Sequence, residues 1–485
     1  MSADAQTDRE SNASRRGASH KRDREASVQV FDSLYQSREK IYPRDIAGRF
    51  QSLRKYAVFL LLGLFYLLPW VPWDGRQAVL FDLPARQFHV FGIVFWPQDF
   101  VYLTLLLIIC AIGLFWVTSL AGRVWCGYAC PQTVWTEVFL WMERWTEGDR
   151  ARRMKLDRGP WTREKLLRKG AKQFLWVSFA AWTGFTFVGF FTPITELGAR
   201  VAQFSLGPWE TFWLIFYGFA TYGNAGFLRE QVCLYMCPYA RFQSAMFDRD
   251  TLIISYDEER GEPRGPRKRG VEPRELGLGD CIDCTLCVQV CPTGIDIRDG
   301  LQYECIACGA CIDACDQVMD RMGYPRGLVR YTTENVLKHG RSHVLRPRTI
   351  VYGLLLLGLM GALLGAVVLR DPLRLNIIPD RNALYRETAG GTIENSYTLK
   401  VMNMDNRPHR YVIEASGLPG LRVETDLAMP FEVAPGGVRN VPARLSTASA
   451  ELRGGGHDIV LTLRATDTGG LSVQEDTRFH APVGR

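Results

Sequence analysis

The 485-residue sequence lacks several signatures of common redox and secreted proteins. It contains no C-x-x-C-H stretch, so it has no attachment site for a c-type haem. No G-x-G-x-x-G follows a plausible strand, which leaves nicotinamide and flavin binding unsupported. No small-residue cleavage site follows the first apolar run. We therefore expect that run to be an uncleaved membrane anchor rather than a signal peptide.

Cysteine is distributed unevenly along the chain. None follows Cys315, and eight of the thirteen cysteines lie between residues 275 and 320. The length indicates several structural units rather than one core. Apolar and polar residues occupy separate stretches, which is the pattern of a membrane protein with soluble parts.

The net charge of +7 raises the question of nucleic-acid binding. The basic residues, however, gather beside the apolar runs, as they do next to anionic lipid or in cytoplasmic loops. Membrane topology therefore explains the charge, and we expect no nucleic-acid partner.

Five apolar runs are expected to be long enough to span a bilayer, which needs about 20 apolar residues. They occupy residues 56–73, 100–120, 174–191, 211–227 and 349–369. Lysine and arginine are dense before the first run, between the second and third, and after the fourth, and sparse in the other two loops. This alternation predicts a cytoplasmic N-terminus and places everything after Leu369 outside.

Two cysteine runs carry the most specific signal in the chain. CIDCTLCVQVCP begins at Cys281 and CIACGACIDACD at Cys305, and both have the C-x2-C-x2-C-x3-C spacing of a bacterial ferredoxin. In such pairs the fourth cysteine of one run ligates the cluster of the other run. The spacing therefore predicts two [4Fe–4S] clusters, one held by Cys281, Cys284, Cys287 and Cys315, the other by Cys291, Cys305, Cys308 and Cys311.

A disulfide framework and a zinc site are the two alternative interpretations of these runs. A disulfide framework is disfavoured in a reducing cytoplasm. Zinc sites usually use two pairs of ligands with a longer gap between them. The second run lacks the proline that completes the first at Pro292, a departure that removes no ligand.

A second cysteine motif, C-x-x-x-C-P, occurs twice: Cys126 and Cys130 precede Pro131, and Cys233 and Cys237 precede Pro238. On a helix, residues four apart share a face, so both sulfurs of a pair can point at one object. The prolines disfavour helical backbone at the preceding cysteine. One such pair alone would be read as packing. Two pairs at the same predicted membrane face indicate four thiolates for a soft ion such as Cu(I), or a dithiol–disulfide couple.

Three weaker candidates are interpreted as structural. Cys110 lies inside the second apolar run and is expected only to pack. His339 and His343 have helical spacing but belong to a basic interfacial stretch. Met402 and Met404 alternate along an expected strand and should mark its buried face.

The whole pattern predicts a multi-domain membrane protein. We expect a five-helix transmembrane bundle, an inserted cytoplasmic ferredoxin domain of the bacterial two-cluster type, and a C-terminal all-β immunoglobulin-like sandwich of roughly seven strands. The expected parts are a disordered cytoplasmic tail at 1–40, the membrane domain with four helices and both CxxxCP motifs at 41–255, the ferredoxin domain at 256–348, the fifth span at 349–369 and the outer sandwich at 370–485.

From residue 40 onward the sequence resembles the FixG/CcoG (RdxA) family of cytochrome oxidase accessory proteins. The resemblance rests on KIYPRDIAGRFQSLR before the first apolar run, both CxxxCP motifs, the double ferredoxin run and the C-terminal sandwich. It implies a multi-pass bacterial inner-membrane protein with a periplasmic C-terminal domain. The implied function is reduction of Cu(II) to Cu(I) for the haem–copper site of cbb3-type cytochrome c oxidase.

By the same resemblance, Cys126, Cys130, Cys233 and Cys237 would be the catalytic, copper-handling thiols, and the ferredoxin runs the electron relay. The implied cofactors are two [4Fe–4S] clusters and copper. The implied partners are copper chaperones or the oxidase assembly machinery, the lipid bilayer and an unidentified electron donor. The alternatives are a quinol dehydrogenase that feeds a respiratory reductase, and a non-enzymatic assembly scaffold.

Overall fold

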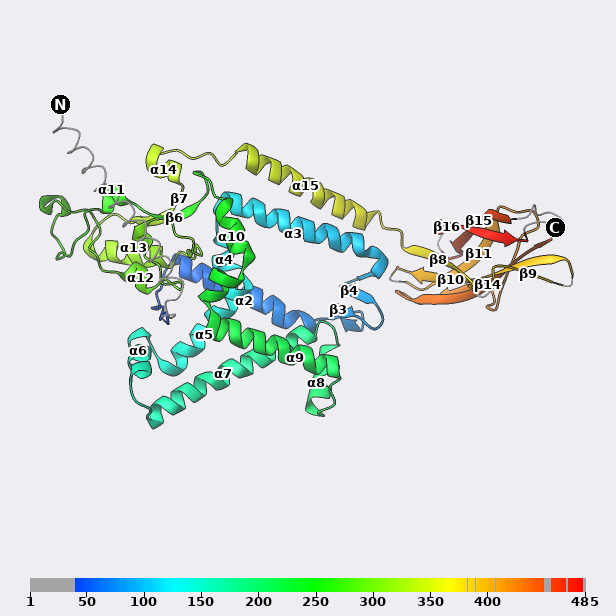
Figure 1. Ribbon diagram of the computed structural model, residues 1–485, viewed down its shortest axis with the longest axis horizontal. Helices are drawn as coiled ribbons and strands as arrows, with labels where there is room; N and C mark the ends of the chain where they lie inside the picture. Colours follow the sequence, from blue (N-terminus) through cyan, green and yellow to red (C-terminus); the bar gives the residue numbers. More distant parts are fainter. Residues whose placement is uncertain are drawn as a thin grey trace, which may run out of the picture.

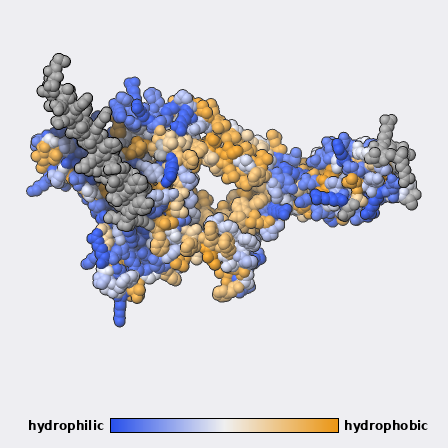
Figure 2. All heavy atoms as spheres, in the orientation of Figure 1, coloured by the Kyte–Doolittle hydropathy of each residue, from blue (hydrophilic) through white to orange (hydrophobic). Residues whose placement is uncertain are grey.

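The chain forms an elongated molecule of three parts in a computed structural model that describes residues 40–381, 383–388, 390–405, 407–448, 455–467 and 470–482. Figure 1 shows a cysteine-rich domain at one end, a group of long helices in the middle and a β-sandwich at the other end. Apolar residues cover the middle, and hydrophilic residues cover both ends (Figure 2). The expected disordered tail falls almost entirely outside the described residues.

Three helical segments among the described residues are long and apolar enough to cross a membrane: Arg49–Trp70, Pro97–Ala121 and Pro347–Val368. They contain α2 (Arg49–Leu67), α3 (Phe100–Ala121) and α15 (Pro347–Val368). Helices α3 and α15 pack together along their length (Figure 1). Leu107 and Leu357 on them are about two-thirds exposed, at 60% and 66%, as residues that face lipid would be.

The other two expected spans fall on helices that do not meet this standard, so the prediction of five spans is corrected to three. Residues 174–191 lie largely on α7 (Arg163–Val188), whose first half is charged and whose second half mixes aromatic with small polar residues. Residues 211–227 begin on α9 (Pro208–Thr221), which continues only as a π-helical turn, η3 (Tyr222–Leu228). Tryptophan, threonine and glycine lower the hydropathy of both segments, and tyrosine lowers that of the second.

Shorter elements connect the long helices. Between α2 and α3 lie η1 (Leu68–Trp70), a two-stranded ribbon, β1 (Pro72–Trp73) with β2 (Arg76–Gln77), and η2 (Pro97–Asp99). The same loop holds a three-stranded antiparallel sheet, β3 (Val79–Asp82), β4 (Gln87–Val90) and β5 (Ile93–Phe95). After α3 come α4 (Val124–Tyr128), α5 (Pro131–Glu147) and α6 (Arg150–Arg158). Helix α8 (Ile194–Ala202) precedes α9. A second π-helical turn, η4 (Val232–Met236), leads to α10 (Pro238–Ala245).

The cysteine-rich domain is closed by pairing of its first and last strands. Strand β6 (Ile253–Tyr256) runs antiparallel to β7 (Val329–Thr332), so the intervening chain forms one lobe. That lobe contains α11 (Glu258–Gly261), η5 (Pro273–Leu276), α12 (Leu286–Gln289), η6 (Ile297–Asp299) and α13 (Ala310–Met322), and α14 (Glu334–His339) follows β7. Tyr256, Met319 and Val329 share its buried core with Cys281.

The C-terminal residues form the expected β-sandwich, with more strands than the roughly seven predicted. One sheet has five strands, β12 (Arg422–Thr425), β14 (Val438–Ala448), β10 (Thr392–Asn403), β8 (Leu373–Pro379) and the short β9 (Arg386–Glu387). The other has four, β13 (Phe431–Val433), β11 (His409–Ser416), β15 (Gly455–Ala465) and β16 (Ser472–Ala481). Alternate residues such as Leu399, Leu461 and Phe479 fill the space between the sheets.

The sandwich is tied to the helical part of the chain. Arg370, after α15, donates a hydrogen bond to Asp99 at the start of α3, and Arg374 lies 3.1 Å from the same carboxylate. Met402 and Met404 pack against Val94 and Trp96 of the small outer sheet.

Candidate iron–sulfur and thiol site

The first four predicted cluster ligands line one cavity. Cys281, Cys284, Cys287 and Cys315 surround it together with apolar side chains that include Val318, Met319 and Leu328. The first three cysteines come from the loop before α12 and from α12 itself, and Cys315 comes from α13. We call this the outer cavity, because Cys284 on its wall is exposed.

The other four predicted ligands line a second, neighbouring cavity. Cys291, Cys305, Cys308 and Cys311 surround it with Ile254, Ile295 and Ile297, and Cys287 reaches it from the outer cavity. Gly309 adopts a left-handed conformation (φ 76°) at the start of α13, and the backbone N–H of Ala307 points at the Cys305 sulfur at 3.4 Å. We call this the inner cavity, because Cys308 is buried.

These two cavities suit cubane clusters better than the other readings. Each offers four thiols around an otherwise apolar space, which is the donor set of a [4Fe–4S] cluster. All thirteen cysteines lie in the described part of the chain and are free thiols, so no disulfide framework exists there.

The two CxxxCP motifs have the same backbone shape. A helix ends four residues before the first cysteine of each pair, at Gly122 (φ 54°, ψ −120°) and at Arg229 (φ 45°, ψ −112°). The second cysteines, Cys130 and Cys237, are extended, and the following proline begins a new helix in each case. The motif that occurs twice in the sequence therefore has the same backbone conformation both times, because proline restricts the residue before it.

Thiols of the two pairs influence one another's charge. Burial raises the pKa of Cys126 to about 12 and that of Cys233 to about 11; Cys130 and Cys237 add to both increases, and Cys233 adds to that of Cys126. The Arg123 guanidinium opposes both shifts. The Cys126 sulfur also lies 3.4 Å from the side-chain oxygen of the buried Gln243, as a donor to it.

Both CxxxC loops contact the second ferredoxin run. A Cβ atom added at Gly127 would lie 2.8 Å from the carbonyl oxygen of Ile306, so only glycine allows this approach. Tyr128 donates its hydroxyl to the Cys308 carbonyl at 3.2 Å, and Tyr303 donates its own to the Leu234 carbonyl at 2.8 Å. The inner cavity therefore lies directly against both thiol pairs.

Arg123 joins the same three segments. Its guanidinium donates hydrogen bonds to the carbonyls of Tyr303 and Ala240 and lies 5.1 Å from the centre of the Tyr303 ring. Arg123 precedes the first thiol pair, Ala240 follows the second, and Tyr303 precedes the second ferredoxin run. Sequence reasoning missed this residue, since a lone arginine carries no motif.

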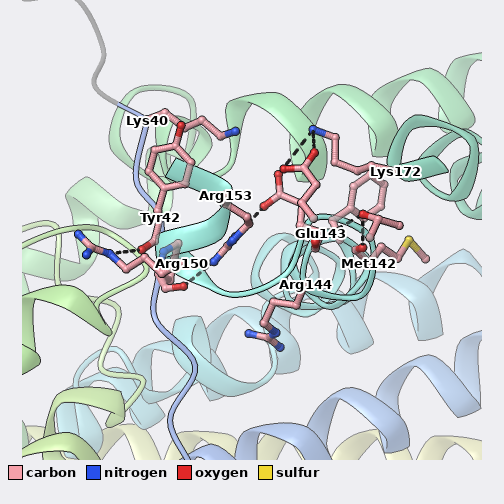
Figure 3. Close-up of polar contacts among 12 residues, drawn as sticks. Lys40, Tyr42, Met142, Glu143, Arg144, Arg150, Arg153 and Lys172 are labelled. Carbon is pink, nitrogen blue, oxygen red and sulfur yellow. Dashed lines mark hydrogen bonds and ion pairs between the residues drawn. The ribbon is translucent and has the colours of Figure 1, made fainter. Parts of the chain in front are cut away.

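A buried cluster of charges supports the site and was also missed. Glu143 on α5 lies 3.0 Å from Arg153, 2.8 Å from Arg229 and 3.9 Å from Lys172 (Figure 3). Burial opposes the negative charge of Glu143, but Arg229 and the other cations hold its pKa below the ordinary value. Arg229 is the residue that ends the helix before Cys233, so this cluster holds the second CxxxCP motif in place.

The KIYPR stretch connects this charge cluster to the ferredoxin lobe. Tyr42 donates its hydroxyl to Asp157 at 2.6 Å, and Arg150 and Arg153 donate to the carbonyls of Tyr42 and Pro43 (Figure 3). The next residue, Arg44, donates its N–H to Gln289 of α12 at 2.8 Å. In the sequence, the KIYPR stretch contributed only to the family resemblance, and nothing in it predicted these contacts.

The weaker candidates stay apart from the site. Cys110 is exposed on α3. His339 and His343 are exposed near α14, at the start of the link to α15. Met402 at the end of β10 and Met404 just after it are buried against Val94 and Trp96, at 0% and 9% exposure, so they pack as expected although every residue from 401 to 404 is buried.

Comparisons with known proteins agree with this organisation. A family model described as "4Fe-4S dicluster domain" matches residues 228–334, and one described as "4Fe-4S binding domain" matches residues 103–149. A third, described as "IG-like fold at C-terminal of FixG", matches residues 363–482. The fold and the site thus define a ferredoxin-type iron–sulfur protein with an immunoglobulin-like C-terminal domain.

Three relatives extend over most of the chain. The protein RdxB of Cereibacter sphaeroides is 43% identical over 85% of this chain and 88% of its own length. RdxA of the same organism is 39% identical over 90% and 96%, and the nitrogen fixation protein FixG of Rhizobium meliloti is 38% identical over 81% and 82%. The chain belongs to the FixG/RdxA family.

Proposed function

We propose that this protein is a membrane-bound iron–sulfur oxidoreductase that reduces Cu(II) to Cu(I) at the CxxxCP thiols. One observation carries the proposal: both CxxxC loops lie against the second ferredoxin run, the first through Gly127 and Tyr128 and the second through Cys233, which lines one pocket with Ile306. An electron carrier in the inner cavity would therefore be separated from the thiols only by packed protein.

The proposed ligands follow the two cavities. Cys281, Cys284, Cys287 and Cys315 would hold one [4Fe–4S] cluster and Cys291, Cys305, Cys308 and Cys311 the other. When bound, such clusters supply single electrons. Apolar side chains line much of both cavities, Arg298 also lines the outer one, and Cys287, which lines both, lies between them.

The thiols Cys126, Cys130, Cys233 and Cys237 act on the copper substrate. Each Cu(II) ion takes up one electron and becomes Cu(I), which soft sulfur ligands prefer. Arg123 and Gln243 position the pairs, Arg123 by hydrogen bonds from its own segment to two others and Gln243 by its contact with Cys126. The ion needs no group of three preformed ligands, since the two pairs are on separate segments that can close on it.

The cellular role follows from the family and the expected topology. We propose three membrane passes, through α2, α3 and α15, with a cytoplasmic thiol site and a periplasmic sandwich in a bacterial inner membrane. Release of Cu(I) beside the membrane would serve copper chaperones or the assembly of a cbb3-type cytochrome c oxidase, which holds copper in its active site.

The test is an anaerobic assay in which the purified protein is reduced with dithionite, freed of the excess reductant, and then mixed with Cu(II) and a Cu(I)-specific chelator. Cu(I) should form in proportion to the electrons stored. A parallel assay supplies a quinol and an artificial acceptor. Quinol oxidation without Cu(I) formation would favour the quinol dehydrogenase, and intact clusters without either reaction would favour a scaffold.

A further inference from the structure

The two cavities differ in their exposure to solvent, and this difference determines where electrons can enter the ferredoxin lobe. Cys308 of the inner cavity is 7% exposed and packs near Ile306 and Cys126. Cys284 of the outer cavity is exposed. An electron that reaches the thiols through this lobe must therefore enter at the outer cavity, since the inner one is covered by the thiol loops.

A basic loop lies beside that entry point. Residues 264–269 carry four cationic side chains and no carboxylate, Arg264, Arg267, Lys268 and Arg269. The loop is fixed to the first ferredoxin run, because Gly265 donates its N–H to the Cys281 carbonyl at 3.2 Å and Arg267 donates to the same carbonyl at 3.4 Å.

The outermost cations of the loop are available to a partner. Lys268 and Arg269 are exposed and take part in none of the ion pairs found among the described residues. Arg264 lies 3.7 Å from Glu262, and Arg267 donates to the Tyr324 hydroxyl at 2.9 Å. Asp283, the exposed acid next to Cys284, is ion-paired with Arg298. Within residues 264–269, the charge that is not ion-paired is therefore positive.

The position of the loop decides between a membrane and a soluble partner. The chain between α11 and α12 lies at the end of the molecule opposite the sandwich, beyond the ends of α2, α3 and α15 (Figure 1). A bilayer around those three helices would not reach it. The charges are thus better placed for a protein that arrives from the aqueous phase.

We propose that residues 264–269 and the exposed edge at Cys284 form the docking surface for an acidic, soluble one-electron carrier protein. This inference rests on the proposed function and names its reductant by class. One electron leaves the reduced carrier for each Cu(II) that becomes Cu(I). Complementary charge at the rim of an interface accelerates association and makes it dependent on salt.

The experiment measures binding of an acidic flavodoxin to the immobilised full-length protein, at low salt and at 0.5 M salt. The test variant is Lys268→Glu/Arg269→Glu. The matched control is Arg152→Glu/Lys155→Glu, which makes the same change of charge at two exposed positions of α6. At low salt, we expect the association rate constant to fall about ten-fold in the test variant and to change little in the control. At 0.5 M salt, the rate constants of all three proteins should converge.

Three results would overturn the proposal. The unchanged protein does not bind the flavodoxin, or both variants lose flavodoxin binding equally. In the third, the test variant loses binding to phosphatidylglycerol vesicles but keeps binding to the flavodoxin. The last would assign the loop to the membrane. Dithionite, a small reductant, separates this proposal from the proposed function. Failure of the dithionite-reduced protein, freed of excess dithionite, to form Cu(I) would reject the copper chemistry and leave the docking result intact.

Discussion

The carboxylate of Asp313 accepts the backbone N–H of Gln51 at 2.8 Å and that of Phe50 at 3.2 Å. Asp313 belongs to α13, between Cys311 and Cys315, whereas Gln51 is in the first turn of α2. A residue of the ferredoxin lobe therefore caps the first membrane-candidate helix. The residue at the usual capping position, Gly48, has no side chain to do so.

This cap predicts an effect of Gly48→Ala. A Cβ atom at Gly48 would lie 2.2 Å from the Asp313 side chain, so the carboxylate must move away from the two N–H groups. Loss of a helix cap costs about 1 kcal/mol, and we expect a lower midpoint in thermal unfolding. Gly63→Ala, on the same helix with no atom near its added Cβ, is the control and should not lower the midpoint. Equal midpoints for the two variants would contradict the capping role.

Cluster content should follow the crossed pattern of ligands. Cys291→Ser should damage the inner cluster and Cys315→Ser the outer one, although each residue lies in the run of the other cluster. In either variant, iron should fall from about eight to about four atoms per chain, and each should lose a different electron paramagnetic resonance signal. Cys110→Ser is the control and should keep all the iron. Loss of the same signal in both variants would reject the crossed assignment.

The thiol pairs should act as one unit. Cys126→Ser and Cys233→Ser should each abolish Cu(I) formation while both clusters remain, because each leaves a pair incomplete. The double variant should be no worse than either single one, since residues of one unit are non-additive. Full activity in both single variants would make these cysteines packing residues, and loss of clusters would make them part of the iron–sulfur lobe.

Glu143 should be essential for stability. Glu143→Gln leaves Arg153, Arg229 and Lys172 without a shared counter-charge in a buried site, and breaking such a pair costs about 3–5 kcal/mol. Glu164→Gln is the control, because its pair with Arg168 is largely exposed and should contribute less than about 1 kcal/mol. Denaturant unfolding in detergent measures both. A small effect of Glu143→Gln would show that water or a rearranged neighbour replaces the carboxylate.

The sandwich should lose stability as the pH rises. His409 is buried, and burial disfavours its charge, but hydrogen bonds to Asp405 (2.9 Å) and Asp467 (3.1 Å) prevail and raise its pKa above the ordinary value of 6.5. Protonated His409 therefore stabilises the fold fully below about pH 6.5, and the contribution disappears as the pH rises through the raised pKa.

Thermal unfolding between pH 5.5 and 8.5 measures this dependence. His409→Gln should weaken it, whereas His457→Gln, on β15 of the same sheet, should leave it in place. A sandwich that becomes more stable from pH 6 to pH 8 in the unchanged protein would contradict the assignment.

The sequence by itself determined whatever depends on local spacing. The gaps between the cysteines from Cys281 to Cys315 predicted two four-thiol sets, and the structure lines one cavity with each set. The prolines after Cys130 and Cys237 predicted the breaks found there, because proline acts on its immediate neighbour. Alternating hydrophobicity predicted the sandwich, since a strand that packs on one face must alternate.

Only the tertiary structure decided how these parts meet. Asp313 and Gln51 are 262 positions apart, and Arg123 and Tyr303 are 180 apart, so no local pattern links them. Their contacts arise because glycines at 48 and 127 let two segments approach to van der Waals distance. The number of apolar spans was also misjudged, because apolar length was read from runs in which aromatic and small polar residues reduce the hydropathy. This packing places the inner cavity against the thiols and the outer cavity towards solvent. Local sequence patterns could not predict that arrangement.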